Sequence, residues 1–302
     1  MYTIPSPRTM DWPNPTEMLV GLVEIFDWDL IQLSTDGADS YANVIGYQVP
    51  LCTQGLPCKI EIFGKSTTAL LHRTGEGEIY CAAANGCESV SLTNILVECN
   101  GPVASQAPVR VDGAVLMIRD CQFSTCSSRT DGGSVQALEA KVTILNTTFH
   151  ESFSMGSGGA ISLVGSMADI NDCSFFNCSA LDSGGSISVL DYQCTSSKML
   201  SSVMNLDSSL FSGCQAQRGG AVTASSGVIS ITESVFVQCE SSTIGGGLAI
   251  SDGYSIVQLN ITNTIFSGNI AHGEGGGAVY LSNTATVLAG LECSIKDRKS
   301  VV

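Results

Sequence analysis

Basic residues are scarce in this sequence. Its 302 residues include 13 Lys and Arg against 28 Asp and Glu, which gives a formal net charge of −15 at pH 7. Nucleic-acid backbones and anionic lipid surfaces are bound through clustered Lys and Arg, which so acidic a chain does not supply. The composition therefore excludes nucleic acid as a partner.

Segments that target or cross a membrane are missing as well. The first 15 residues have no basic stretch followed by an apolar core, so they do not resemble a signal peptide. The most apolar early stretch, 18–33, carries Glu24, Asp27 and Asp29, and charged side chains are costly inside a bilayer. We therefore expect no direct membrane insertion by this chain.

Motifs for catalysis and metal binding are also lacking. No CxxC, HExxH, GxSxG, P-loop or GGxGxD sequence occurs. Only three histidines are present, and one of them, His272, lies near Glu274 in a glycine-rich stretch where a surface position is commoner than a catalytic one. The sequence therefore predicts no catalytic, cofactor-binding or metal-binding residues, and no cofactor.

Cysteine, by contrast, is plentiful. Thirteen cysteines are many for a reducing compartment, so they favour an extracellular or cell-surface location, associated with the outer membrane if the source is bacterial. The odd number leaves at least one thiol unpaired within a monomer. Three N-x-[ST] sequences, at Asn146, Asn177 and Asn260, would accept glycans in a secreted eukaryotic protein.

Glycine and hydrophobic residues recur with a period. Charged residues make up 14% and hydrophobic residues 44%, which is the reverse of a disordered composition. Phenylalanines stand at Phe123, Phe149, Phe175, Phe211, Phe236 and Phe266. Paired glycines begin at Gly132, Gly158, Gly184, Gly219, Gly245 and Gly276. Both sets repeat about every 26 residues and share one longer interval, so the period is real.

Further columns keep the same phase. Five residues before each phenylalanine stand Ile118, Ile144, Ile170, Leu206, Ile231 and Ile261. Seven before stand Leu116, Val142, Ala168, Met204, Ile229 and Leu259. Three before stand Asp120, Asn146, Asp172, Ser208, Glu233 and Asn263. Three after stand Cys126, Ser152, Cys178, Cys214, Cys239 and Asn269. The apolar columns alternate with polar ones, which is the period of a strand and not of a helix.

These columns predict an all-β protein, a right-handed parallel β-helix with about 26 residues per coil. A single coil cannot bury its apolar side, but stacked coils bury one continuous core. The handedness follows from the crossover rule for parallel strands. The glycine pairs suit sharp corners where φ is positive and backbones approach closely.

Three regions follow from the pattern. Residues 1–51 show no columns and form an extended lead-in with a capping helix at 18–33. Residues 52–89 form degenerate coils, and residues 90–302 form the regular coils, of which seven are visible to about residue 290. Ten extra residues between Phe175 and Phe211 predict a protruding loop at 190–202.

The repeated motifs resemble those of a known family. The glycine motif reads GGAIS at 158–162, GGSIS at 184–188, GGAVT at 219–223 and GGAVY at 276–280, and FSGN stands at 266–269. Together, GG-A-[IV] and F-x-x-N resemble the repeats of the polymorphic outer-membrane proteins, bacterial autotransporter adhesins of the pectin-lyase-like β-helix superfamily. The resemblance covers about 90–290, although cysteine replaces asparagine in most coils. It implies a passenger-like β-helix with an adhesion role, without the autotransporter β-barrel.

Two functions remain open from the sequence. The first is a non-enzymatic cell-surface or secreted protein with an adhesin-like or structural role, binding a protein or glycan receptor through one flank and the 190–202 loop. The alternative is a carbohydrate-active enzyme, a polysaccharide lyase or glycoside hydrolase. Such enzymes need carboxylates that converge from adjacent coils. The polar column three residues before each phenylalanine alternates charged with neutral residues, which is typical of a turn-capping ladder and favours the first function.

The cysteine column allows several interpretations. The simplest is a small buried hydrophobe that replaces a stacked asparagine. Disulfides between Cys178, Cys214 and Cys239 are disfavoured because in-register Cβ vectors run parallel. The pairs Cys121/Cys126 and Cys173/Cys178 are alternatives, and the connectivity stays open.

Overall fold

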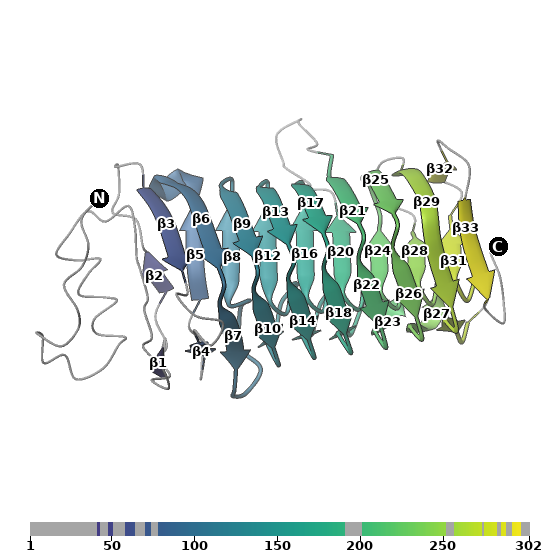
Figure 1. The fold of residues 1–302 in the computed structure, drawn as a ribbon, viewed down its shortest axis with the longest axis horizontal. Helices are drawn as coiled ribbons and strands as arrows, with labels where there is room; N and C mark the ends of the chain where they lie inside the picture. The colour runs from purple at the N-terminus through teal and green to yellow at the C-terminus, as the bar shows by residue number, and fades with distance from the viewer. Residues whose placement is uncertain are drawn as a thin grey trace, which may run out of the picture.

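A parallel β-solenoid of about seven turns, with roughly 26 residues per coil, forms the described part of the chain (Figure 1). The computed structural model describes residues 41–42, 48–50, 58–63, 70–73, 78–190, 201–251, 257–273, 275–282, 285–287 and 292–296. Within these residues every strand pairing is parallel and the strands form three sheets. The predicted fold class is confirmed.

The largest sheet, here sheet A, contains two strands from most coils. Its eighteen strands are β1 (Tyr41–Ala42), β3 (Cys58–Phe63), β4 (Leu70–Arg73), β6 (Cys87–Thr93), β7 (Leu96–Cys99), β9 (Val115–Arg119), β10 (Gln122–Ser124), β13 (Lys141–Leu145), β14 (Thr148–His150), β17 (Met167–Asn171), β18 (Ser174–Phe176), β21 (Val203–Asp207), β22 (Leu210–Ser212), β25 (Gly227–Thr232), β26 (Val235–Val237), β29 (Val257–Ser267), β32 (Ala285–Val287) and β33 (Glu292–Lys296). In the last regular coil, β29 spans the positions that two strands occupy elsewhere. This sheet carries the aliphatic and phenylalanine columns.

The other two sheets close each coil. Sheet B contains β2 (Gln48–Pro50), β5 (Glu78–Ala82), β8 (Val109–Asp112), β12 (Val135–Leu138), β16 (Ile161–Val164), β20 (Ile187–Leu190), β24 (Val222–Ala224), β28 (Leu248–Ile250) and β31 (Val279–Leu281). Sheet C contains β11 (Ser127–Ser128), β15 (Phe153–Ser154), β19 (Ser179–Ala180), β23 (Gln215–Arg218), β27 (Glu240–Ile244) and β30 (Ile270–Ala271). In the part of the chain that the structure describes, one 3-10 turn, η2 (Ala83–Asn85), interrupts the strands.

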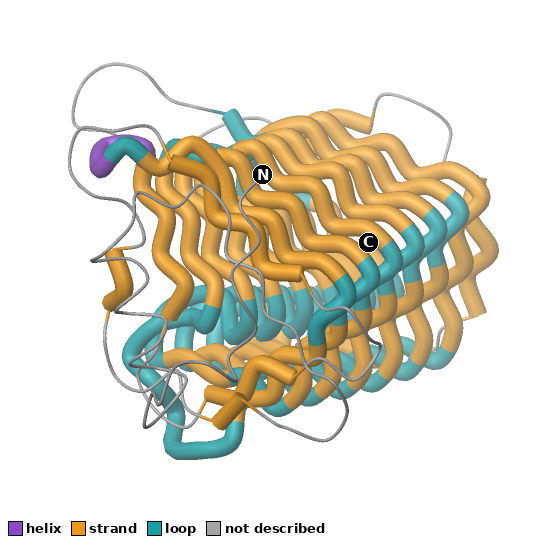
Figure 2. The backbone as a smooth tube through the Cα atoms, turned by 60° about the vertical axis from the view of Figure 1, so that its left-hand side comes forward, coloured by secondary structure: helices purple, strands orange, loops and turns teal. Residues whose placement is uncertain are grey.

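The coil winds in the right-handed sense. In Figure 1 the chain advances from left to right, while the nearer strands β9 and β13 run downward and the fainter strands β8 and β12 lie behind them. Figure 2 shows the turns of successive coils aligned in rows along the axis. The corners therefore recur at the same positions in each coil.

The apolar columns face inward, as the periodicity predicts. Ile144 pairs with Ile118 on one side and Ile170 on the other, and all three are fully buried. The six phenylalanines form a ladder in which neighbouring ring centroids lie 4.6–5.0 Å apart with interplanar angles of 1–11°. Each such pair contributes about 0.5–1.5 kcal/mol beyond its buried area. This phenylalanine ladder fixes the register of sheet A.

The glycine pairs meet two separate demands at one corner. The first glycine has positive φ, from 59° to 73° in the pairs that begin at Gly132, Gly158, Gly184, Gly219 and Gly245. The second glycine lies against the next coil, because a Cβ on Gly159 would stand 2.0 Å from the carbonyl oxygen of Gly185. The predictions of a positive φ and a close approach are both confirmed.

A second inward column completes the sheet A corner. Two residues before each phenylalanine stand Cys121, Thr147, Cys173, Ser209, Ser234 and Thr264, all buried. Their side chains hydrogen-bond within the core: Ser209 Oγ accepts from the backbone N–H of Cys173 at 3.2 Å and donates to the carbonyl of Asp207 at 2.8 Å. The column thereby satisfies backbone groups that the turn leaves out of the sheet ladder.

The two ends and the long loop were given separate expectations. Among the described residues, β1 and β2 already pair in sheets A and B, within the region expected to be a lead-in. The expected capping helix at 18–33 lies outside the described residues. Most of the expected loop, 191–200, lies outside them too, whereas Leu190 and Val203 on either side of it pair with the preceding coil.

Candidate functional site

The polar column before each phenylalanine forms a turn. Asn94, Asp120, Asn146, Asp172, Ser208, Glu233 and Asn263 all adopt left-handed φ values between 45° and 56°. Asn146 Nδ2 donates to Asp120 Oδ1 at 2.7 Å, which links two coils through their turns. Aspartate and asparagine tolerate this conformation better than most residues. The interpretation as a turn-capping ladder is therefore confirmed.

Other carboxylates on the outer face of sheet A are linked to neutral partners. Asp169 Oδ1 accepts a hydrogen bond from Asn205 Nδ2 at 2.8 Å across one coil step. Asp207 accepts hydrogen bonds from Thr232 in the following coil and from Ser208. These contacts are lateral ladders between coils, with acid next to amide or hydroxyl.

His272 makes a contact between two coils. His272 Nε2 contacts Glu240 Oε1 in the preceding coil, since Ile270 pairs with Glu240 in sheet C. Both side chains are about half exposed. Glu274, the neighbour considered from the sequence, lies outside the described residues. The contact is a surface ion pair when the histidine is protonated, and such pairs contribute little to stability.

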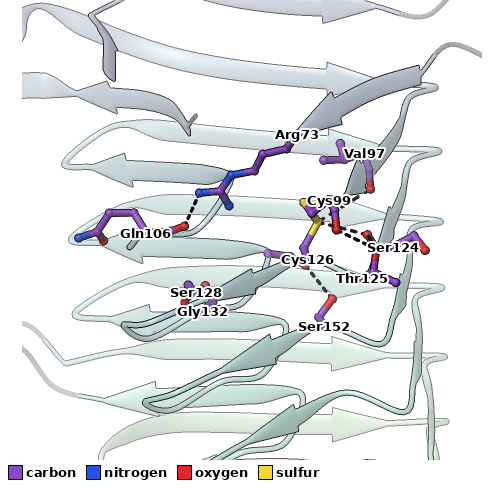
Figure 3. The surroundings of a disulfide bond; sticks show 11 residues. Arg73, Val97, Cys99, Gln106, Ser124, Thr125, Cys126, Ser128, Gly132 and Ser152 are labelled. Carbon is purple, nitrogen blue, oxygen red and sulfur yellow. Dashed lines mark hydrogen bonds between the residues drawn. A yellow bond between two sulfur atoms is a disulfide. The ribbon is translucent and has the colours of Figure 1, made fainter. Parts of the chain in front are cut away.

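Among the described residues, four cysteines form two disulfides near the N-terminal end. Cys81 bonds to Cys87 across the η2 turn, and Cys99 bonds to Cys126 in the next coil with a Cα–Cα distance of 4.7 Å. Figure 3 shows the second bond close to Arg73, whose guanidinium donates to the carbonyl of Gln106 at 2.7 Å. The Cys81–Cys87 bond closes the turn that η2 forms between these two cysteines.

The alternative pairings Cys121/Cys126 and Cys173/Cys178 are wrong. Cys126 bonds to Cys99, while Cys121, Cys173 and Cys178 are free and buried. The physical reason is an offset of one residue. Val97 and Phe123 are in register, and Cys99 stands two residues after the first whereas Cys126 stands three after the second. The offset removes the parallel alignment of Cβ vectors that disfavours in-register pairs.

The remaining cysteines of the column replace asparagine in a hydrogen bond. Cys178 and Cys214 place Sγ 3.6 Å from the carbonyl oxygen of the preceding coil's phenylalanine. Asn269 Nδ2 makes the same contact with Phe236 at 3.0 Å. Burial raises the pKa of the Cys178 and Cys239 thiols well above the ordinary value. These thiols are inert core groups, as the simplest interpretation predicts.

Figure 1 shows the run of sheet A strands from β17 to β29, and the outward residues of these strands follow an ordered pattern that the inward columns do not reveal. A first apolar file contains Met167, Val203 and Val228 in adjacent strands. A second apolar file contains Leu210, Val235 and Ile265. Between the two lies an acidic band of Asp169, Asp172, Asp207 and Glu233. The first file stands eight residues before Phe175, Phe211 and Phe236. The second file stands one residue before Phe211, Phe236 and Phe266, and both sets of positions face outward.

The described residues contain no group of three or more His, Cys, Asp or Glu side chains arranged to hold a metal ion. None of the helical segments in this part of the chain is long and apolar enough to cross a membrane.

Comparison with known proteins finds no family model, curated protein or solved structure that matches this chain. The fold is thus defined by its own geometry as a parallel β-solenoid. The resemblance of its motifs to polymorphic outer-membrane protein repeats, and the pectin-lyase-like assignment, stay predictions from the sequence.

Proposed function

We propose that this chain is a non-enzymatic cell-surface or secreted protein that binds a protein or glycan receptor through the outer face of its solenoid. The observation that carries the proposal is the contrast between core and surface. The inner columns stack in register over the whole regular region, whereas the outer face of sheet A keeps Met167 57%, Val228 38% and Ile265 42% exposed. Ordered apolar files on a surface are typical of interaction sites.

The chemistry of the polar groups supports binding over catalysis. Glycosidases need a carboxylic acid and a second carboxylate facing each other across the scissile bond. On the described outer face, Asp120, Asp169 and Asp207 instead hydrogen-bond amide or hydroxyl groups of the adjacent coil. The two disulfides support a location in an oxidising compartment.

The test uses the full chain. Fluorescently labelled protein is incubated with intact cells and with immobilised glycans, and unlabelled protein competes for the bound fraction. We expect saturable binding that the competitor displaces. In parallel, the protein is incubated with polygalacturonate and neutral polysaccharides, and new chain ends are measured. Turnover of any of these glycans would replace the binding function by that of a polysaccharide lyase or hydrolase.

A further inference from the structure

We propose that the acidic band and the two apolar files of sheet A form one docking surface for a basic amphipathic segment of a partner protein. The inference deepens the proposed function and rests on it, because it names the chemistry of the receptor. The occupant is a peptide segment that combines Lys or Arg with aliphatic side chains.

The first step is the imbalance of charge. Residues 142–190, 201–251, 257–273 and 275–282 contain seven carboxylates, Glu151, Asp169, Asp172, Asp182, Asp207, Glu233 and Glu240. Against them stands one basic residue, Arg218, whose Nη2 lies 2.7 Å from Asp182 Oδ1. Among the described residues after 141 the other basic residue is Lys296, whose strand partner Ser267 lies outside the band, and Lys141 stands beside Met167 at the edge of the first file. No Lys or Arg therefore stands within the acidic band itself.

The second step is the state of the band itself. Asp169, Asp172, Asp207 and Glu233 take part in none of the ion pairs among the described residues. Asp169 and Asp207 accept hydrogen bonds only from neutral groups, which leaves their charge uncompensated. Like charges on adjacent coils repel each other, and a cationic partner would relieve that repulsion.

The third step is the position of the apolar files. Met167, Val203 and Val228 lie in paired register on three adjacent strands, so their file is about 10 Å long at the strand spacing of a sheet. The second file, which includes Val235 and Ile265, runs on the other side of the band. Charge flanked by apolar contact matches a segment that carries Lys or Arg close to aliphatic side chains.

The probe is a short labelled peptide of alternating lysine and leucine, and its binding to the full chain is measured by fluorescence anisotropy. Two peptides of equal length serve as controls, one with glutamate in place of lysine and one with serine in place of leucine. We expect the lysine–leucine peptide to bind and to weaken as salt rises from about 50 mM to about 300 mM. We expect the glutamate peptide not to bind, and the lysine–serine peptide to bind at least about tenfold more weakly.

Variants locate the site. The band variant combines Asp172→Asn, Asp207→Asn and Glu233→Gln, which keep shape and hydrogen-bonding capacity while removing three charges. We expect it to weaken binding of the lysine–leucine peptide about tenfold or more. A second variant, Met167→Gln with Ile265→Thr, removes apolar contact and should weaken the same peptide without changing the salt dependence.

A matched control removes the same charge elsewhere. Glu88→Gln, Glu98→Gln and Glu151→Gln together also change the net charge by three, and we expect an effect within about threefold because these sites lie outside the band. Equal losses in the band and control variants would overturn the proposal, since net charge alone would explain binding. Equal affinity for the lysine–serine and lysine–leucine peptides would overturn it too.

The two proposals fail separately. If the band variant binds cells as strongly as the wild type does, the receptor-binding function stands, and the acidic band is not the surface that contacts the receptor. Peptide binding that depends on the band, in a chain that binds no cell or glycan, would support the docking surface and overturn the surface-receptor function.

Discussion

The coils before and after residue 141 are held together in different ways. In the earlier coils, Cys81–Cys87 and Cys99–Cys126 are covalent links, and Val97 occupies the position of the phenylalanine ladder. In the later coils the cysteines that the structure describes are free, and the aromatic rings stack from coil to coil. One backbone architecture is therefore stabilised by cross-links at one end and by repeated packing at the other.

The surface charge differs in the same direction. Residues 78–141 contain seven Asp and Glu and four Lys and Arg, whereas the described residues 142–282 contain seven and one. The irregular end carries mixed charge, and the regular end carries an acidic face with apolar files. Side chains alternate between the two faces of each strand. The regular packing of the inward side chains therefore leaves the outward positions free to vary in charge and polarity.

The largest effect is expected at the glycine corner, which the coils use from Gly132 onward. Gly159→Ala should lower the free energy of unfolding by more than about 4 kcal/mol, because the new Cβ would stand 2.0 Å from a backbone oxygen. Urea denaturation followed by circular dichroism measures it. Ala107→Gly is the control in the earlier coil, since Ala107 precedes Val109 as Gly133 precedes Val135. We expect it to cost no more than about 1 kcal/mol.

The phenylalanine ladder comes next. Phe149 lies fully buried between Phe123 and Phe175, with centroid distances of 5.0 Å on both sides. Phe149→Ala should cost about 3–5 kcal/mol through lost contacts and the cavity left behind. His150→Ala, one residue on, should stay within about 0.5 kcal/mol because that side chain is 40% exposed. Denaturant melts in which both variants lose the same stability would contradict the inward and outward assignment.

The disulfide tests the covalent end of the comparison. Cys99→Ser breaks a link between residues separated by 27 positions and should cost about 2–4 kcal/mol. Cys121→Ser is the matched control, because that free thiol stands in a column where Ser209 and Ser234 occur naturally. It should cost about 1 kcal/mol or less. Thermal melts with and without reductant measure both. A stability of the Cys99→Ser variant equal to that of the control would show that the cross-link contributes nothing.

The smallest effect is a dependence on pH in the later coils. Burial raises the pKa of the Cys173 thiol from 9.0 to about 12. The native state therefore holds this proton more tightly than the unfolded state, so stability is full below pH 9.0 and falls as pH rises toward about 12. At pH 10 the loss from this group should be about 1.4 kcal/mol.

Cys173→Ser isolates that contribution. The variant keeps a small hydrogen-bonding side chain, as at Ser209, and removes the titration. Urea melts at pH 8 and pH 10 should show the wild type losing more stability than the variant. Equal losses would mean that the native and unfolded thiols titrate alike.

Much of the fold can be predicted from the sequence, because the repeat period assigns each residue a position within its coil. The spacing of Phe149 and Ile144 assigns the inward face of sheet A, and the glycine pairs assign one corner. The acidic band cannot be predicted from the sequence columns, because its members come from different strands and share no single column. Asp172 and Glu233 belong to the turn column, whereas Asp169 and Asp207 occupy two further outward positions. Only parallel pairing brings them to one surface.

By itself, then, the sequence determined a right-handed parallel solenoid with a phenylalanine ladder, since a strict repeat admits only one way to bury its apolar columns. The tertiary structure decided what depends on neighbouring coils. It joined Cys99 to Cys126 through an offset of one residue, and it turned the outward positions into an acidic band between two apolar files. The physical reason is that inward side chains all pack into one shared core, so their pattern is visible within each coil. Outward side chains acquire neighbours only after coils stack at the strand spacing of about 4.8 Å.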